Sequence, residues 1–204
     1  MEWQKLGGEF IRDYRFSSNE YAKTVKSAFK VDESELRARE IRRMVGSIEF
    51  HARPRQDVDA IFLAAEVSQA RQINPALAYH YVGAIPVYAT SQVFNGSTDT
   101  TLDQDLNGIK FSTLPWYFNQ NLPEHKNISR FGDTNPGLQP LYALGVDSFY
   151  LFPRLRQLKQ IANASFYGQT GKLKLDAQGK VVRDQVWAEY RSGGVIPIRD
   201  SQPQ

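Results

Sequence analysis

Few residues of this sequence have the types and spacing that catalysis or metal binding requires. The three histidines are His51, His80 and His125, and none lies at helical ligand spacing from another or from a pair of carboxylates. The chain contains no cysteine, which excludes disulfides, thiolate catalysis and thiolate–metal sites. No strand–turn–helix serine elbow flanked by glycines is present. We therefore expect no catalytic residue and no bound metal ion.

Phosphate-binding and nucleotide-binding motifs are incomplete. The sequence GQTGK at 168–172 is similar to a phosphate loop, but Phe166 stands where that loop needs its first glycine and Leu173 where it needs a hydroxyl. Gly83 and Gly96 do not form a dinucleotide fingerprint. Entry into a hairpin explains 168–172 better, and we expect no cofactor.

Polar residues follow two apolar segments that we expect to be neighbouring parallel strands. Glu66 comes after the first segment, and Thr90, Ser91 and Gln92 come after the second. Ligands and partners of open parallel sheets gather at the carboxyl ends of the strands, so these four residues are candidate contacts. An ordinary strand exit explains Thr90 and Ser91 equally well, and Ser68 nearby is more simply a helix N-cap.

An aromatic cluster follows Pro115. Trp116 and Tyr117 could anchor a protein partner, because aromatic side chains are enriched in interfaces. Large aromatic side chains also dominate core burial, which favours a structural role for Trp116. We retain both residues as candidate partner contacts.

Segment 55–94 predicts the scaffold for these residues, because it has the pattern of a strand, a helix and a strand. Residues 58–64 form a near-continuous apolar run, typical of a strand buried on both faces, and 85–89 repeats it. Between them Ala70, Ile73 and Leu77 have helical spacing, and Pro75 stands where a new first turn can begin. We therefore expect a parallel sheet with a right-handed crossover.

The flanking segments predict further elements. Before residue 55 we expect a helix that ends at Gly7, a strand at 10–16, a helix from about 19, and a helix from Asp32, with a capping box to Glu35, to about Gly46. After residue 94 we expect a loop, a strand at 106–114, and a loop at 119–137 that leaves one subdomain for another. Helices bent at Pro153 should follow at 138–161, then a hairpin from 170 to 190.

Composition and charge narrow the classes of partner. The chain has 204 residues, 41% hydrophobic content and a formal net charge of +3, which is typical of a soluble globular protein. Four arginines form the only cluster of basic residues in the sequence: Arg37, Arg39, Arg42 and Arg43. Acidic residues are interleaved with them, so we interpret the cluster as a solvated helix face and do not expect nucleic-acid binding. No apolar stretch approaches the roughly 20 residues that span a bilayer.

Five segments in order, RQDVDAIFLAAEVSQARQINPAL, PVYATSQVFNG, DLNGIKFSTLPW, ALGVDSFYL and TGKLKLDAQGKVVRDQVWAEYRSG, resemble the carboxyl-terminal domain of the LppC-type bacterial lipoproteins, the penicillin-binding-protein activators. The resemblance covers nearly the whole chain. It implies a periplasmic protein that a lipid tethers to the outer membrane and that is not itself an enzyme. It also implies one partner, a class A penicillin-binding protein whose peptidoglycan crosslinking the protein stimulates.

The same resemblance refines the fold class. We expect an α/β protein with a three-layer, mostly parallel sheet and flanking helices, which is one lobe of a type I periplasmic-binding-protein-like fold plus a carboxyl-terminal hairpin. The expected parts are a parallel lobe at 1–118, a crossover with helices of the other lobe at 119–165, a returning hairpin at 166–197 and a disordered tail at 198–204. The lipid-bearing cysteine and most of the first lobe would lie outside this sequence. Exposed apolar surface on the helical segment then predicts a homodimer of the fragment.

Two other functions remain open. A small-ligand sensor would bind in a cleft between lobes and use Thr90, Ser91 and Gln92, although fold alone is a weak warrant for function. A doubly wound enzyme would need an acid or base at a strand end, and Glu66 is the only carboxylate there.

Overall fold

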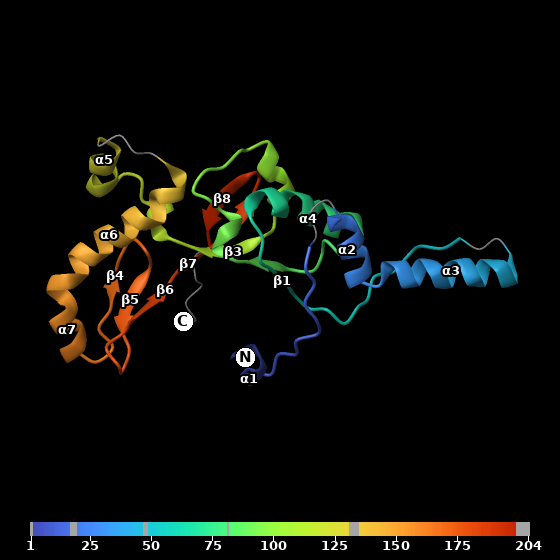
Figure 1. Ribbon diagram of the computed structural model, residues 1–204, viewed down its shortest axis with the longest axis horizontal. Helices are drawn as coiled ribbons and strands as arrows, with labels where there is room; N and C mark the ends of the chain where they lie inside the picture. The colour runs from blue at the N-terminus through green and yellow to red at the C-terminus, as the bar shows by residue number, and fades with distance from the viewer. Residues whose placement is uncertain (1, 17–19, 47–48, 81, 131–134, 199–204) are drawn as a thin grey trace. The chain divides into compact units, whose positions relative to one another are not determined.

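The computed structural model describes residues 2–16, 20–46, 49–80, 82–130 and 135–198 (Figure 1). Its contacts divide the chain into two compact units, one of residues 1–59 and 72–85 and the other of residues 60–71 and 86–204. The boundaries expected at 118, 165 and 197 stay predictions. The tail expected at 198–204 lies, apart from Ile198, outside the described residues.

In the described part of the chain, three helices precede the first strand: α1 (Glu2–Lys5), α2 (Tyr21–Ala28) and α3 (Val31–Val45). As predicted, a glycine stops the first of them, because Gly7 has φ 86° and its N–H donates to the Gln4 carbonyl. The strand predicted at 10–16 is wrong. These residues have no strand structure, and Phe10 and Ile11 are exposed, because no strand among the described residues offers them ladder hydrogen bonds.

The core of the first unit forms where α2 meets α3. Val25, Phe29, Val31 and Ala38 are buried there. The capping box is wrong, since α3 begins at Val31 after Lys30 in the left-handed conformation, and Lys30 supplies no side-chain cap. The end predicted at Gly46 is confirmed: Gly46 has φ 90° and donates to the Arg42 carbonyl.

Helix α4 (Val67–Tyr79) begins earlier than the sequence predicted and runs through Pro75 as one helix. Ser68 is not its N-cap, because the helix starts at Val67 and the Glu66 carbonyl accepts the first hydrogen bonds, from Gln69 and Ala70. Pro75 lies inside the helix and starts no new one. The predicted apolar face is confirmed, with Ala70, Ile73 and Leu77 buried.

The main sheet has five strands in the order β1 (Ile61–Leu63), β2 (Val87–Ala89), β3 (Lys110–Thr113), β7 (Val186–Arg191) and β8 (Gly194–Pro197). Strands β1, β2 and β3 are parallel, with Ile61 opposite Val87 and Ala89 opposite Phe111. Strands β7 and β8 then pair antiparallel. The α/β class with a parallel-rich sheet and flanking helices is confirmed.

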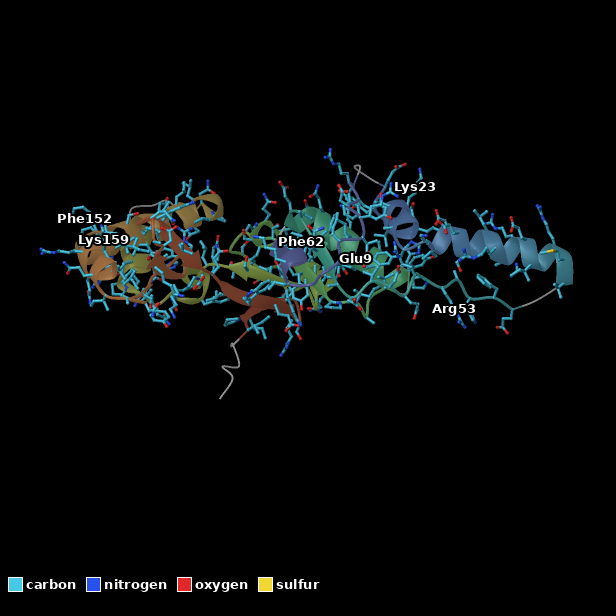
Figure 2. All side chains as sticks on the ribbon, turned by 90° about the horizontal axis from the view of Figure 1, so that it is seen from below. Glu9, Lys23, Arg53, Phe62, Phe152 and Lys159 are labelled. Atoms are coloured by element: carbon cyan, nitrogen blue, oxygen red, sulfur yellow. The ribbon has the colours of Figure 1, made fainter. Side chains whose placement is uncertain are left out.

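Burial differs between the faces of β1. Leu63 is 3% exposed, whereas Phe62 is 73% exposed (Figure 2), so the prediction of a strand buried on both faces is wrong at Phe62. The buried centre of the sheet comes from Phe111 and Ala188, each 0% exposed. Successive side chains of a strand point to opposite faces, so one covered face suffices to order β1.

The second sheet contains the predicted hairpin, but the hairpin ends earlier than predicted. Strand β5 (Lys172–Leu175) pairs antiparallel with β6 (Val181–Asp184), and β4 (Phe166–Tyr167) pairs with β5. The Asp176 carboxylate orders the turn between these strands, because it accepts from the N–H groups of Gln178 and Lys180. The predicted return strand is divided into two elements. Strand β6 pairs with β5, and the residues that follow it form β7, which pairs with β3 in the main sheet.

Helices fill the segment between the sheets. The loop predicted at 119–137 contains a helix, α5 (Pro123–Arg130), which the sequence analysis missed. The bent helical segment is confirmed: α6 (Gln139–Leu151), the 3₁₀ turn η5 (Phe152–Arg154) and α7 (Leu155–Gln160) follow one another, with Pro153 at the bend.

Candidate functional site

The carboxyl ends of the parallel strands form one edge of the second unit. The chain leaves β1 for Glu66, and it leaves β2 for Thr90, whose N–H donates to the Leu63 carbonyl of β1 at 3.1 Å. Ser91 begins the 3₁₀ turn η1 (Ser91–Val93). The ladder therefore fixes the exits of β1 and β2 side by side, as predicted for Glu66 and Thr90.

Thr90 is the polar residue of this edge with an unsatisfied group. Its Oγ1 atom is buried and has no hydrogen-bond partner among the described residues. Ser91, Gln92 and Glu66 are exposed. A buried hydroxyl without a hydrogen-bond partner destabilises the folded chain. A bound group that donated a hydrogen bond to this hydroxyl, or accepted one from it, would therefore be stabilising.

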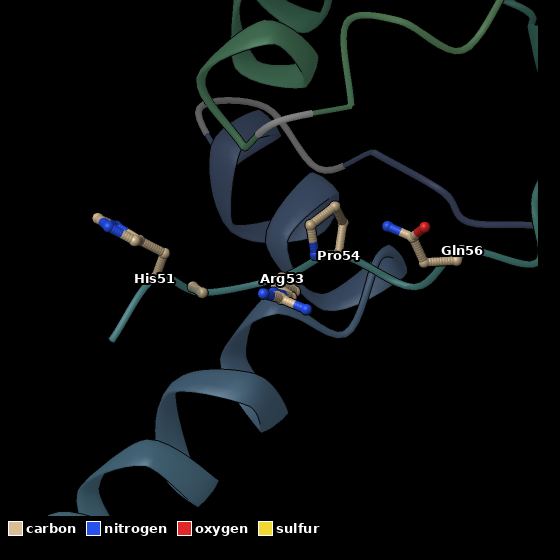
Figure 3. Close-up of a pocket in the computed structure, with 5 residues that line it drawn as sticks. His51, Arg53, Pro54 and Gln56 are labelled. Carbon is tan, nitrogen blue, oxygen red and sulfur yellow. The ribbon is translucent and has the colours of Figure 1, made fainter. Parts of the chain in front are cut away.

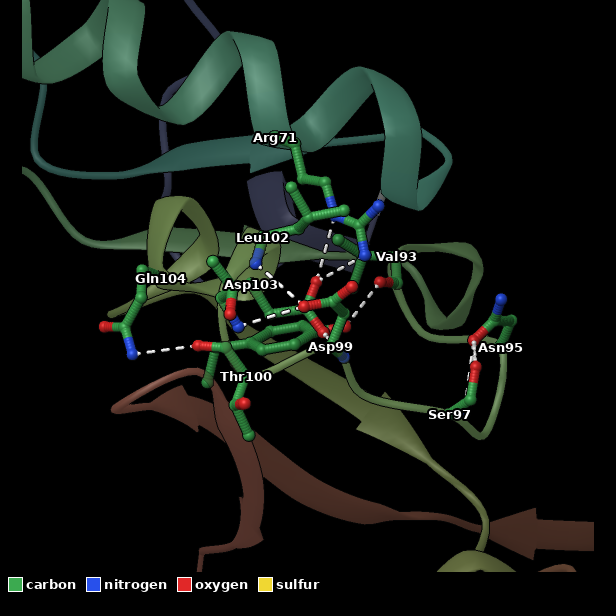
Figure 4. A network of polar contacts seen from close by, with 11 residues as sticks. Arg71, Val93, Asn95, Ser97, Asp99, Thr100, Leu102, Asp103 and Gln104 are labelled. Atoms are coloured by element: carbon green, nitrogen blue, oxygen red, sulfur yellow. Dashed lines mark hydrogen bonds and ion pairs between the residues drawn. The ribbon is translucent and has the colours of Figure 1, made fainter.

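An ion pair with a buried carboxylate joins helix α4 to the segment that follows η1 (Figure 4). Nε and Nη2 of Arg71, on α4, donate to Oδ1 of Asp103 at 3.0 and 2.7 Å, and Asp103 is 0% exposed. The second oxygen, Oδ2, accepts the Asp99 N–H at 2.7 Å. Charge and hydrogen bonds are thus matched, as a buried carboxylate requires.

Asp99 orders the turn that carries Asp103. Its Oδ1 accepts from the N–H groups of Thr101 and Leu102, both at 3.0 Å, and these bonds lower the pKa of Asp99. The segment after Asn95 was predicted as a plain loop, which is wrong, because it contains the 3₁₀ turn η2 (Leu102–Leu106). The missed signal is Asp99 itself, three residues before Leu102, because an aspartate at that spacing can accept the N–H groups at the start of a turn.

Trp116 does not present its ring to solvent. It is 0% exposed, its Nε1 donates to Gln139 Oε1 at 2.7 Å, and its ring stacks on His125 with centroids 3.5 Å apart. The surface-anchor interpretation is therefore wrong for Trp116, and the core interpretation is right. Its backbone N–H also donates to the Gln169 carbonyl at 3.0 Å, which ties this turn to the loop after β4.

Tyr117 is half-buried and reaches the strand-end edge. Its ring packs edge-on against Phe94, with centroids 5.1 Å apart. Gly96, at φ 91°, lies so close that a Cβ there would approach Tyr117 Cε1 to 2.4 Å. Burial raises the pKa of the Tyr117 hydroxyl. The structure thus brings Tyr117 together with the turn after β2 and separates it from the buried Trp116.

The surface hollows lie elsewhere. In the first unit, a groove of about 520 Å³ is lined by His51, Arg53, Pro54 and Gln56 (Figure 3), and a neighbouring one of about 390 Å³ extends along α3 to Arg37. None of the predicted strand-end residues lines either groove. Among the described residues, no three acidic or histidine side chains are grouped to hold a metal ion, and no helix has the length and apolarity to cross a membrane.

Comparison with known proteins decides the family. The family model described as "LppC putative lipoprotein" matches residues 1–193. The chain belongs to this family. The "Penicillin-binding protein activator LpoA" of Photobacterium profundum is 28% identical over 210 residues, which cover 98% of this chain and 33% of that protein. This member of the LppC family thus spans about a third of the length of that curated relative.

Solved structures support the fold of the LppC-family chain. The LpoA C-domain of Haemophilus influenzae, titled a regulator of PBP1A, superposes with a TM-score of 0.61 at 21% identity and covers 97% of this chain and 64% of its own. A "putative branched-chain amino acid ABC transporter" from Chromobacterium violaceum superposes with a TM-score of 0.60 at 25% identity, covering 93% of this chain and 52% of its own. The predicted likeness to a periplasmic-binding-protein fold is confirmed.

Proposed function

We propose that this chain is part of a non-catalytic regulator of peptidoglycan synthesis that binds and activates a class A penicillin-binding protein. One observation carries the proposal: the LppC family model matches 193 consecutive residues, and curated relatives aligned over nearly the whole chain bear the name of penicillin-binding-protein activators. The protein acts through a surface, and the synthase supplies the catalytic groups.

The proposed place of action is the periplasm, with a lipid anchor in the outer membrane. Support comes from the family description as a lipoprotein. A regulator tethered there reaches the synthase from the outer-membrane side.

A pull-down and a crosslinking assay test this function. The native polypeptide that carries this sequence is mixed with the cognate class A synthase and its lipid-linked substrate. We expect retention of the synthase on the immobilised regulator and a higher fraction of crosslinked muropeptides. A native polypeptide that neither retains the synthase nor raises crosslinking would exclude the proposed function.

A second candidate function is favoured by one atom. The buried Thr90 Oγ1 without a partner, next to exposed Ser91 and Gln92, suits a small polar ligand at the strand ends. Such a ligand would act as a sensor input to the regulator.

Thermal shift with wall-derived amino acids, sugars and muropeptides tests the sensor function. Binding raises the melting temperature by mass action, and Thr90→Val should abolish the rise while keeping the side-chain shape. Exposed Thr98→Val is the matched control and should leave the rise unchanged. No shift at millimolar concentrations of any of these ligands would reject the sensor.

A further inference from the structure

The sequence contains two asparagine–glycine pairs, Asn95–Gly96 and Asn107–Gly108, and the structure holds them differently. An asparagine before glycine is prone to lose ammonia, because glycine has no Cβ to shield its backbone nitrogen from the asparagine side chain. Both asparagines are exposed. Exposure therefore does not distinguish the two pairs, whereas their hydrogen bonds do.

The Asn107 pair is held by hydrogen bonds at all three groups that take part in this chemistry. Asn107 Nδ2 donates to Gln104 Oε1 at 3.0 Å, and Asn107 Oδ1 accepts from the Gly193 N–H at 3.1 Å. The Gly108 N–H donates to the Tyr190 carbonyl at 2.9 Å. The attacking and leaving nitrogens are thus both engaged, so this pair must open locally before it reacts.

The Asn95 pair lacks two of these three restraints. Neither Asn95 Nδ2 nor the Gly96 N–H has a hydrogen-bond partner among the residues that the structure describes. Asn95 Oδ1 accepts from the N–H and the Oγ of Ser97, at 3.1 and 3.0 Å (Figure 4). Donors on this oxygen draw electron density from Cγ and stabilise the negative charge that develops when a nucleophile attacks that carbon. The turn therefore activates Cγ without restraining either nitrogen.

We infer that Asn95 is a site of spontaneous deamidation and that Asn107 is protected from this reaction. The Gly96 nitrogen attacks Cγ of Asn95, so that the N–Cγ bond forms and the Cγ–Nδ2 bond breaks. Ammonia leaves and takes the proton that the Gly96 nitrogen gives up. Water, the only co-reactant, then opens the succinimide ring at either carbonyl and leaves aspartate or isoaspartate at position 95.

The reaction changes a tightly packed turn. Gly96 has φ 91°, and a Cβ there would clash with the Tyr117 ring, so the Gly96 backbone lies against that ring. Isoaspartate lengthens the main chain by a methylene group just before Gly96, and either product adds a negative charge. The turn that follows η1 should therefore pack less well against Tyr117 after the reaction.

Peptide mapping by mass spectrometry, during incubation of the native polypeptide at physiological pH, measures both reactions. In the folded protein we expect Asn95 to deamidate at least about tenfold faster than Asn107, because the Asn107 pair must first break its hydrogen bonds. In concentrated urea the two should react at similar rates, since each asparagine precedes glycine. Asn95→Gln should remove the first acidic species seen on ion exchange, and the matched Asn107→Gln should leave that species unchanged.

Equal rates in the folded protein, or a faster reaction at Asn107, would overturn the inference. A difference of the same size in urea would also overturn it, because the order would then come from the sequence and not from the hydrogen bonds. The acidic species isolated by ion exchange should melt below the unmodified protein. Identical melting temperatures would overturn the predicted loss of packing on Tyr117.

Discussion

The Asp147 carboxylate holds helix α6 to the loop between β4 and β5. Asp147 is 2% exposed and accepts from the N–H groups of Gln169 and Thr170 at 2.6 and 2.7 Å and from Thr170 Oγ1 at 2.5 Å. Gly168 leaves room for it, because a Cβ there would meet the carboxylate at 2.5 Å. The carboxylate thus replaces backbone partners that the loop lacks.

Asp147→Ala should lower the free energy of unfolding by about 3 kcal/mol, because it leaves buried donors without an acceptor. Urea unfolding followed by tryptophan fluorescence measures the change. Ser148→Ala, exposed on the next position of α6, is the control and should stay within about 0.5 kcal/mol of the wild type. Equal stability of the two variants would show that the loop does not depend on the carboxylate.

Asp57 and Arg55 form an ion pair whose contribution to stability depends on pH. Two hydrogen bonds of 2.6 Å from the Arg55 guanidinium lower the pKa of Asp57 from 3.8 to about 2. Because the pKa is depressed in the folded chain, the pair contributes above the usual value of 3.8 and its contribution is lost as pH falls toward 2. In an NMR titration, Arg55→Gln should return the Asp57 midpoint toward 3.8, whereas Arg53→Gln should not. A midpoint near 3.8 in the wild type would refute the pair.

At the scale of elements, replacing either of two glycines in the β5–β6 hairpin by alanine should lower stability, but by different amounts. Both have positive φ, 139° at Gly171 and 79° at Gly179, but a Cβ at Gly171 would lie 2.4 Å from the Asp184 carbonyl oxygen, while Gly179 has open space. Gly179→Ala should therefore cost about 1 kcal/mol through backbone strain alone, and Gly171→Ala clearly more. Thermal unfolding of both variants checks the order, and the reverse order would contradict the close approach.

Elements with a clear apolar pattern were predictable, and pairings between distant segments were not. The runs around Ile61 and Val87 indicate parallel strands on their own, and their parallel pairing confirms this. The pairing of Lys110 with Glu189 joins segments far apart in the sequence, so no local pattern indicated that β7 would enter the main sheet. Segment 10–16 shows the converse, because a strand-like pattern forms no strand without a neighbour.

The position of the candidate site could be predicted from the sequence, but the buried contacts around it could not. The carboxyl-end rule located Glu66 and Thr90 at one edge, since it needs only strand direction. The Arg71–Asp103 pair and the burial of Trp116 depend on three-dimensional proximity, and a sequence alone offers both surface and core interpretations of such residues.

At the scale of the whole molecule, exposed aromatic side chains should govern association. Phe149 on α6 and Phe152 in η5 are 75% and 78% exposed. Contiguous apolar surface favours self-association, so this chain should be a concentration-dependent dimer in light scattering at tens of micromolar. Phe149→Ser/Phe152→Ser should give a monomer, whereas Phe62→Ser should not. A wild type that stays monomeric at several hundred micromolar would exclude this contact.

The second unit contains one extended run of chain that serves two sheets. Strand β6 ends at Asp184 and β7 begins at Val186, so Gln185 alone separates the hairpin from strand β7 of the larger sheet, which pairs with β3. A one-residue connection leaves almost no freedom for the hairpin to move independently of β7. A macromolecule that binds and displaces the hairpin would therefore also strain the pairing between β7 and β3.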